Sequence, residues 1–247
     1  MHTIKRVGVM RTSGVAFSAI GSVALGISNS TNTASGGFGK RRSHNNLGIS
    51  MDIGARGGLV ELPKTLGPSW VHEIKHDGYR LMARKQGDRV RLYTRNGHDW
   101  AARYPTIARA IMGLKVESIL LDGEVVVCDD KGVADFDRLH SRCFDKEAIM
   151  YAFDLLELNG AEVGHEPFAD RKKKLAKLLR KPSYGLMLNE HTDYDGELIF
   201  QHACKMGLEG IVSKRRDLLY RSGRAKSWIK VKNPHGPAMQ RAKDVTF

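Results

Sequence analysis

Cysteine is scarce in this 247-residue chain, which contains only Cys128, Cys143 and Cys204. Their odd number and the lack of any C-x-x-C spacing argue against a zinc ribbon and against a disulfide framework, and they fit a reducing compartment. A Walker A motif is also missing, because Gly39-Lys40 has neither the upstream glycine nor a following Ser or Thr. A phosphate-binding loop of the Walker type is therefore excluded.

Acidic residues are absent from residues 1–51, which carry six basic residues and so contribute +6. The rest of the chain holds 34 of the 40 basic residues and all 27 acidic ones, so it contributes the other +7 of the net +13. An excess of this size points to a polyanionic partner, most simply nucleic acid. The basic residues of the first segment are Lys5, Arg6, Arg11, Lys40, Arg41 and Arg42.

Long hydrophobic runs are lacking as well. Residues 13–28 are apolar but rich in Gly, Ala and Ser, too short and too weakly hydrophobic to span a membrane, so no membrane partner is expected. Residues 30–37 form a small, polar linker. We expect residues 1–58 to be a disordered, basic, low-complexity extension. A targeting peptide, or non-native sequence translated ahead of Met51, remains an alternative.

From about residue 59 the composition becomes that of a globular domain. Strands are predicted near 70–74, 79–84, 89–94, 119–127, 149–158, 210–212 and 228–231, with helices from Pro105, over 170–180 and from Asp195 to a stop at Gly207. Strands with irregularly interspersed helices favour an α+β fold with largely antiparallel sheets.

Lys75 lies in the octet Glu73-Ile74-Lys75-His76-Asp77-Gly78-Tyr79-Arg80, at the end of an apolar strand. Asp77-Gly78 predicts a hairpin turn into a second strand, so the lysine would be held beside a tight turn. A lysine amine can act as a nucleophile if its surroundings favour the unprotonated form. The alternative is a surface hairpin with an ordinary solvated lysine.

Carboxylates interrupt otherwise hydrophobic strands at two further places. Asp122-Gly123-Glu124 lies within residues 119–127, and Glu209 follows the helix-ending Gly207 and begins another apolar run. Charges in such positions need a partner or a metal, so each is either a buried salt bridge or part of a site.

Two other stretches alternate with a period of two. In Tyr151-Ala152-Phe153-Asp154, Tyr151 and Phe153 are expected on one face and Asp154 on the other. In residues 227–232, Lys230 and Lys232 share a face. An aromatic residue on a strand is commonly core, and paired lysines can protect an edge strand.

Taken in chain order, the five segments at residues 73–80, 122–124, 151–156, 209–214 and 227–232 resemble motifs I, III, IIIa, IV and V of the covalent nucleotidyltransferases, which comprise ATP-dependent DNA ligases, RNA ligases and mRNA capping enzymes. All of them fall within residues 73–232. Three stretches of the sequence are similar to bacterial DNA ligases of the end-joining type: residues 72–80, Thr94-Arg95-Asn96-Gly97 and residues 220–224. The resemblance covers residues 63–234 and implies an ATP-grasp-like nucleotidyltransferase fold.

The resemblance also implies residue roles. Lys75 would form a covalent bond to AMP from ATP, with Mg²⁺ or Mn²⁺ as the metal, and pass the AMP to a 5′-phosphate at a nick in duplex DNA during repair, recombination or replication. The catalytic residues would be Lys75, Lys230 and Lys232. The same three lysines would bind the nucleotide together with Glu73, Arg80, Arg95, Glu124 and Phe153. The metal would be held by Glu124 and Glu209. An ATP-consuming enzyme fits the cytoplasm better than secretion.

The chain departs from the family pattern at both ends of the resemblance. The region before Trp70 is short, and only fifteen residues follow Lys232. Ligases continue into an OB-fold, which fifteen residues cannot form. We therefore expect an adenylation domain at 59–235 and, in place of an OB-fold, a stub at 236–247. The sequence leaves open whether an OB-fold or an end-joining partner acts in trans.

Three alternatives remain open from the sequence. An RNA ligase shares the same motifs, because motif I does not distinguish DNA from RNA. A guanylyltransferase is less favoured by the text of residues 220–232. A truncated pseudo-ligase would bind nicks without turnover, although carboxylates at Glu124 and Glu209 in apolar strands have no evident purpose in such a protein.

Overall fold

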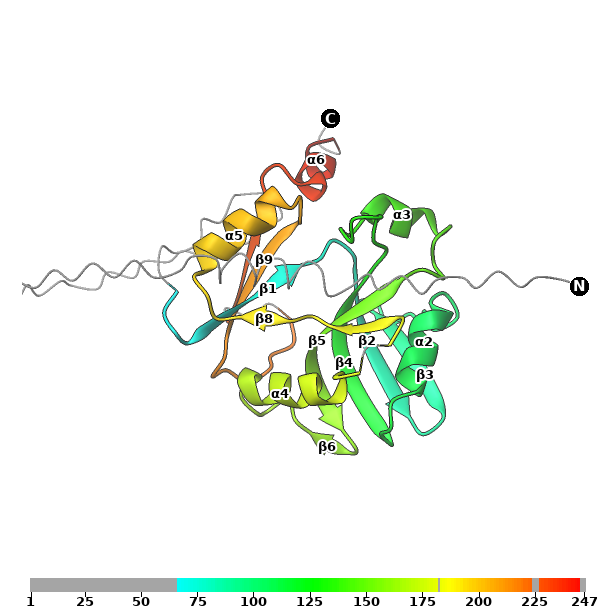
Figure 1. The fold of residues 1–247 in the computed structure, drawn as a ribbon. Coiled ribbons are helices and arrows are strands. Elements are labelled where there is room, and N and C mark those ends of the chain that lie inside the picture. Colours follow the sequence, from blue (N-terminus) through cyan, green and yellow to red (C-terminus); the bar gives the residue numbers. More distant parts are fainter. Residues whose placement is uncertain (1–65, 182, 224–226, 245–247) are drawn as a thin grey trace, which may run out of the picture.

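Two β-sheets face each other in this computed structural model, which describes residues 66–181, 183–223 and 227–244 (Figure 1). One sheet has four strands in the order β10-β9-β1-β8, and the other has six, β3-β2-β4-β5-β6 with β7 beside β5. Only the β5–β7 pair is parallel among the described strand pairs, so the predicted α+β fold with largely antiparallel sheets is confirmed. The strands are β1 Trp70–Lys75, β2 Tyr79–Gln86, β3 Arg89–Thr94, β4 Ser118–Val126, β5 Ile149–Leu158, β6 Ala161–Glu162, β7 Leu186–Leu188, β8 His191–Thr192, β9 Gly210–Arg215 and β10 Trp228–Lys232.

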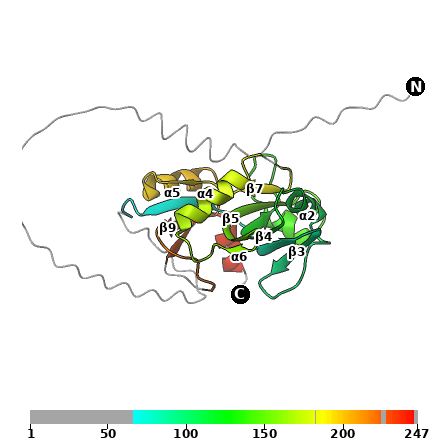
Figure 2. The ribbon, with the colours of Figure 1, turned by 90° about the horizontal axis from the view of Figure 1, so that it is seen from below.

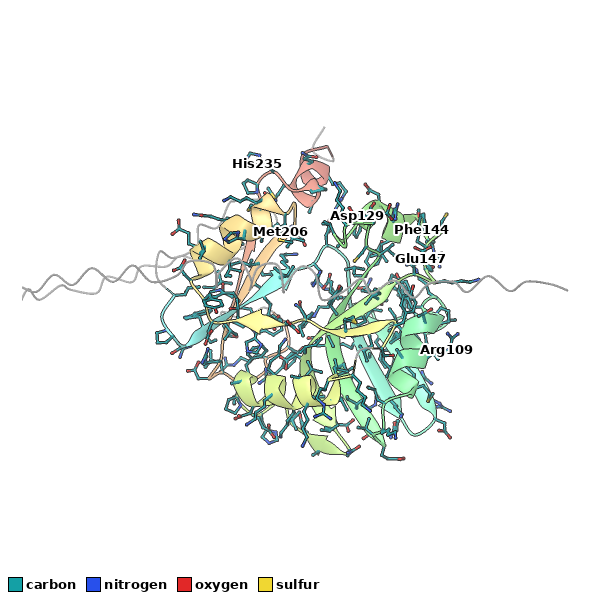
Figure 3. The ribbon with its side chains drawn as sticks, in the orientation of Figure 1. Arg109, Asp129, Phe144, Glu147, Met206 and His235 are labelled. Carbon is teal, nitrogen blue, oxygen red and sulfur yellow. The ribbon has the colours of Figure 1, made fainter. Side chains whose placement is uncertain are left out.

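Each sheet has a hydrophobic core of its own. Helix α2 packs against β2, β3 and β5 over the larger core, and α5 packs against β1 and β9 over the smaller one. The two helices lie at opposite ends of the molecule in both views (Figure 1, Figure 2). In Figure 3, Arg109 marks α2 and His235 lies beside α6. The helices are α2 Pro105–Met112, α3 Phe136–Ser141, α4 Phe168–Leu178, α5 Gly196–Lys205 and α6 Pro237–Asp244.

Strands β1 and β2 do not form the predicted hairpin. β1 pairs with β8 and β9, whereas β2 pairs with β3 and β4, so the turn at Asp77-Gly78 carries the chain from one sheet to the other. A side chain at Gly78 would meet the carbonyl oxygen of Val125 at 2.1 Å. Glycine is therefore required there because the backbone passes directly against β4, not because a tight hairpin turns.

The predicted alternation in β5 is wrong at Asp154. Register shifts place Tyr151 opposite Glu124 and Asp154 opposite Asp122, on one face of β4. Two residues three apart can share a face only if a bulge intervenes, and the extra residue here is Phe153. Strand β4 itself runs through residues 122–124 without interruption.

Helix α4 begins earlier than expected, at Phe168, and buries more than its leucines. Leu175 is in the core as predicted, but Arg171 and Lys172 are also fully buried. The predicted helices at Pro105 and Asp195 are confirmed, with the Asp195 side chain accepting from the backbone N–H of Leu198. Helices α3 and α6 and the short strands β6, β7 and β8 were not predicted.

The predicted extension at 1–58 lies outside the described residues, so that boundary stays a prediction. Part of the expected stub at 236–247 forms helix α6. Among the described helices, none is both long and apolar enough to cross a membrane.

We predict that Gly210→Ala destabilises the fold more than an ordinary glycine substitution does. Gly210 has φ +144°, and an added Cβ would meet the carbonyl oxygen of Val231 at 2.0 Å, where β9 pairs with β10. Backbone strain and forced strand separation together should lower the free energy of unfolding by about 3 kcal/mol, measured by urea denaturation.

Gly132→Ala is the control, because Gly132 has φ +80° but no neighbouring atom within 4 Å of the added Cβ. Strain alone should cost about 1 kcal/mol there. Equal losses for the two variants would contradict the steric argument.

Candidate active site

A cleft of about 440 Å³, open to solvent, lies between the two sheets. The connection from β1 to β2 crosses it, which explains why residues from both sheets reach the same space. It is lined by Glu73, Ile74, Lys75, His76, Arg80, Glu124, Phe153, Asn189, Val212, Lys214, Trp228 and Lys230. Of the predicted site residues, Arg95, Glu209 and Lys232 are not in this lining.

Lys75 ends β1 and points to Glu209. Its Nζ lies 2.5 Å from Oε2 of Glu209, while Oε1 of the same carboxylate lies 3.4 Å from Nζ of Lys232. The register explains this contact, since Lys75 and Lys232 both pair with Gly210, the residue after Glu209. The alternative of an ordinary solvated surface lysine is excluded, because the Lys75 side chain is only 17% exposed.

Lys230 and Lys232 share one face of β10, as predicted, while Ile229 and Val231 are buried on the other. Lys230 lines the cleft, and Lys232 lies at its edge on Glu209. Burial lowers the pKa of Lys230, and the charges of Lys75 and Arg80 lower it further. The cleft is therefore strongly cationic at this end.

Glu124 is the carboxylate that faces those cations. It lies opposite Arg80 on β4, and burial raises its pKa to about 7, although the charges of Lys75, Lys230 and Arg80 act in the other direction. The negative charge of Glu209 also contributes to the increase. A buried carboxylate that faces a second carboxylate is a typical place for a cation to bind.

The buried salt bridge that was the alternative for residues 122–124 forms at Asp122 and, among the described residues, not at Glu124. Its carboxylate accepts from Nε of Arg80 at 2.9 Å and from Nη2 at 2.5 Å, and it also accepts from the hydroxyl of Tyr220 at 2.9 Å. Asp122 is fully buried. Arg80 is thus positioned by Asp122, with its guanidinium 5.7 Å from the ring centroids of both Phe153 and Trp228.

Phe153 forms an aromatic wall of the cleft. Its ring meets that of Trp228 edge to face, with centroids 5.7 Å apart. Nζ of Lys214 lies 4.4 Å from the Phe153 centroid and 4.1 Å from the Trp228 centroid, which is cation–π geometry. A flat ring with a polar rim would fit this wall.

Glu73 is held at the inner end of the cleft by two lysines that the sequence did not reveal as partners. Nζ of Lys172 and Nζ of Lys214 lie 2.6 Å from its two carboxylate oxygens. Burial alone would raise the pKa of Glu73, but the two lysines together lower it. Asn189 also donates from its side-chain amide to the carbonyl oxygen of Ile74, which fixes the strand next to Glu73.

Lys172 could have been found from spacing. It stands three residues before Leu175 and four after Phe168, so it occupies the same helix stripe as the buried apolar residues. Arg171 beside it is likewise buried and pairs with Asp154 through two bonds of 2.8 Å. A cation in an apolar stripe indicates a buried carboxylate opposite.

His76, directly after Lys75, was also missed. Its ring stacks on Tyr151 with centroids 4.1 Å apart, and Nε2 lies 3.1 Å from Oδ1 of Asn189. Burial lowers the pKa of His76 to about 4, so it is neutral at pH 7. The residue therefore stiffens the Lys75 loop without adding charge.

Asp77 fixes the other side of that loop. It forms an ion pair with Arg241 of α6, whose guanidinium lies 4.8 Å from the ring centroid of Phe136 on α3. Helix α6 thus joins the Lys75 loop to α3 (Figure 1). Arg95, by contrast, lies on the exposed turn after β3.

Two facing sheets with a lysine, carboxylates and further lysines around one cleft define the nucleotidyltransferase domain of ATP-dependent ligases. A sequence profile described as "ATP dependent DNA ligase domain" matches residues 60–232, and the chain belongs to this family. It is 37% identical over 196 residues to a multifunctional non-homologous end joining protein LigD of Pseudomonas aeruginosa. The aligned region covers 72% of this chain and 23% of that protein.

Solved structures agree with this assignment. The ligase domain of LigD from M. tuberculosis has a TM-score of 0.60 at 38% identity and covers 66% of this chain and 54% of that one. A mycobacterial DNA ligase D, solved with ATP and MES, has a TM-score of 0.59 at 36% identity with the same coverage. The chain therefore spans about half of those ligase domains and less than a quarter of the LigD protein.

We predict that Glu124→Gln stabilises the metal-free fold, most strongly at alkaline pH. The pKa of Glu124 rises from 4.5 to about 7 on folding, so the folded chain binds the proton more tightly and loses stability as pH increases through that window. Glutamine has no such penalty. In urea denaturation with a chelator, its advantage should be near zero at pH 4 and reach about 3 kcal/mol at pH 8.

The matched control is Glu190→Gln, at an exposed carboxylate. Its effect on the free energy of unfolding should be small and should not change between these pH values. A pH-independent effect of Glu124→Gln would contradict the raised pKa.

Proposed function

We propose that this domain forms a covalent lysyl–AMP adduct at Lys75 and acts in sealing 5′-phosphate, 3′-hydroxyl nicks in duplex DNA. The observation that supports this most is the convergence of Lys75, Glu124 and Lys230 on one cleft that an aromatic wall also lines. The amine of Lys75 attacks the α-phosphorus of ATP, the bond to the β-phosphate oxygen breaks, and pyrophosphate leaves. AMP then passes to the 5′-phosphate of the nick, and the 3′-hydroxyl displaces it.

The proton that Lys75 must lose has an acceptor in place. Oε2 of Glu209, 2.5 Å from Nζ, is positioned to take it as the N–P bond forms. Lys230 in the cleft and Lys232 at its edge are positioned to stabilise the charge that develops on the α-phosphate oxygens.

The nucleotide would be bound by residues from both sheets. Phe153 would stack on the base, and Arg80, oriented by Asp122, would contact the ribose or a phosphate. Glu73 would accept from the adenine amino group, since a carboxylate offers about four acceptor sites and the two lysines do not fill them all. Arg95 would reach the phosphate of the nicked strand from outside the cleft.

A divalent cation fits the carboxylate pair. No group of three or more His, Cys, Asp or Glu side chains suited to a metal occurs in the described ranges. Mg²⁺ is commonly held by one or two carboxylates, its other positions being filled by water and substrate phosphates, so Glu124 and Glu209 are sufficient donors. The ion would supply Lewis-acid stabilisation of the phosphate charge.

The cellular role is proposed from the relatives. The LigD proteins bear names for non-homologous end joining, and we place this domain in repair of DNA breaks in the cytoplasm. We also propose that an OB-fold or an end-joining partner acting in trans assists sealing. Sealing assays with and without a separately expressed OB-fold domain test this point.

We predict that incubation with ATP and Mg²⁺ adds the mass of AMP to Lys75. Lys75→Ala removes the nucleophile, and Lys75→Arg fails as well because guanidinium stays protonated. Intact mass followed by peptide mapping measures the adduct. Lys177→Arg, at an exposed position on α4, is the control and should retain it.

An adduct that survives in Lys75→Ala, or maps to another lysine, would overturn the assignment. Sealing of matched DNA and RNA nicks by the adenylated chain then distinguishes a DNA ligase from an RNA ligase.

Metal dependence gives a separate prediction for the carboxylates. Glu124→Ala and Glu209→Ala should slow adduct formation by about two orders of magnitude, and higher Mg²⁺ or Mn²⁺ should recover part of the loss because each variant removes one donor. The measurement is single-turnover adduct formation across a metal titration. Folded variants with wild-type rates at low metal would mean that both residues serve only as salt-bridge partners.

A further inference from the structure

Strands β2 and β3 have one exposed face, and the cleft uses only its end at Arg80. Leu81 and Ala83 of β2 and Leu92 of β3 point into the core covered by α2. The opposite face is exposed, and alternation along the two strands brings three arginines to it. We call them the arginine face: Arg84, Arg89 and Arg91.

The register places these charges against one another. Arg84 lies directly opposite Arg91, and Arg89 lies opposite Gln86. Like charges at directly opposed positions of an antiparallel pair destabilise the sheet. The fold keeps this repulsion at an exposed position, where a neutral residue would have removed it.

The arginine face forms no ion pair with the described part of the chain. Arg80 pairs with Asp122 and Arg103 with Asp145, but none of the three arginines of the face has an ion pair or a hydrogen bond to a described side chain. Their hydrogen-bond donors are therefore available to an external anion. Guanidinium groups bind phosphate in particular because their paired N–H donors match its oxygens.

The arginine face is continuous with the cleft. Arg80, which lines the cleft, precedes Arg84 by four residues on β2, so both side chains point to the same side of the sheet. Four residues of strand span about 13 Å, and nucleotides along one strand of a duplex rise about 3.4 Å each. A duplex that passes Arg80 along β2 would thus present phosphates to the arginine face about four nucleotides beyond Arg80.

We propose that Arg84, Arg89 and Arg91 bind the sugar–phosphate backbone of duplex DNA on one side of the nick. This proposal rests on the proposed function, because it requires the nick to lie at the cleft. The contacts are to phosphates, so binding by this face is independent of base sequence and sensitive to salt. The face fixes the position of the duplex, and the cleft performs the chemistry.

The test is equilibrium binding of the full chain to a fluorescent nicked duplex across a range of salt. In the double variant Arg84→Gln with Arg91→Gln, loss of two phosphate contacts should make the negative slope of log K against log salt shallower by about 1.8. The control, Lys173→Gln with Lys177→Gln, removes the same charge from exposed positions on α4 and should leave the slope unchanged.

A second arm varies the DNA. One substrate has the duplex arm on one side of the nick shortened to three base pairs, and a second substrate has the other arm shortened. For one of these two substrates, wild type and the double variant should have the same slope of log K against log salt. Arg84→Lys with Arg91→Lys retains the charges and should retain most of the slope, which separates lost contacts from misfolding. Adduct formation at Lys75 should be the same in all variants.

An unchanged slope in the glutamine variant, or an equal change in the α4 control, would overturn the proposal. Repeating the binding in the Lys75→Ala background keeps it independent of catalysis. If Lys75 forms no adduct but the slope still falls as expected, the proposed function fails and the arginine face stands.

Discussion

The buried contact of Glu73 with Lys172 and Lys214 is the constraint on which the site depends. It connects β1, α4 and β9, three elements that come from distant parts of the sequence. Removing one partner of such a cluster leaves an uncompensated buried charge, which typically costs about 3–5 kcal/mol. Because Glu73 is two residues before Lys75 on β1, the same contact that joins these elements also sets where the nucleophile ends its strand.

The same logic of fixed charge extends to the other carboxylates. Asp122 holds Arg80, Asp154 holds Arg171, and Glu209 holds Lys75. In each pair the carboxylate is the more buried or equally buried partner. The cation is therefore oriented by a carboxylate whose own position is fixed by the surrounding protein. Preorganised cations are what a reaction at phosphorus requires, since its transition state is stabilised chiefly by charge and position. Glu124 forms no ion pair within the described part of the chain, and its burial raises its pKa although cations lie nearby.

The sequence predicted those features that depend on local pattern. Alternation was sufficient for Lys230 and Lys232, and motif order was sufficient for Lys75, Glu124 and Phe153 to be expected in one site. It failed where the outcome depends on which strands pair. Asp77-Gly78 is a good hairpin signal, yet its strands join different sheets, and the bulge at Phe153 is invisible to a period-two reading. The burial of Arg171 and Lys172 was not predicted, although Lys172 lies in the apolar stripe of its helix.

The placement of positive charge also separates two tasks. Four cations in or beside the cleft already have carboxylate partners within the chain, so their net contribution to attracting a distant polyanion is small; they are Lys75, Arg80, Lys172 and Lys214. Arg84, Arg89 and Arg91 lack such partners among the described residues and stand on the same sheet face, outside the cleft. Long-range attraction depends on unpaired surface charge, whereas catalysis depends on paired and oriented charge. A sheet that continues from one region into the other lets a duplex held by the first be aligned with the second.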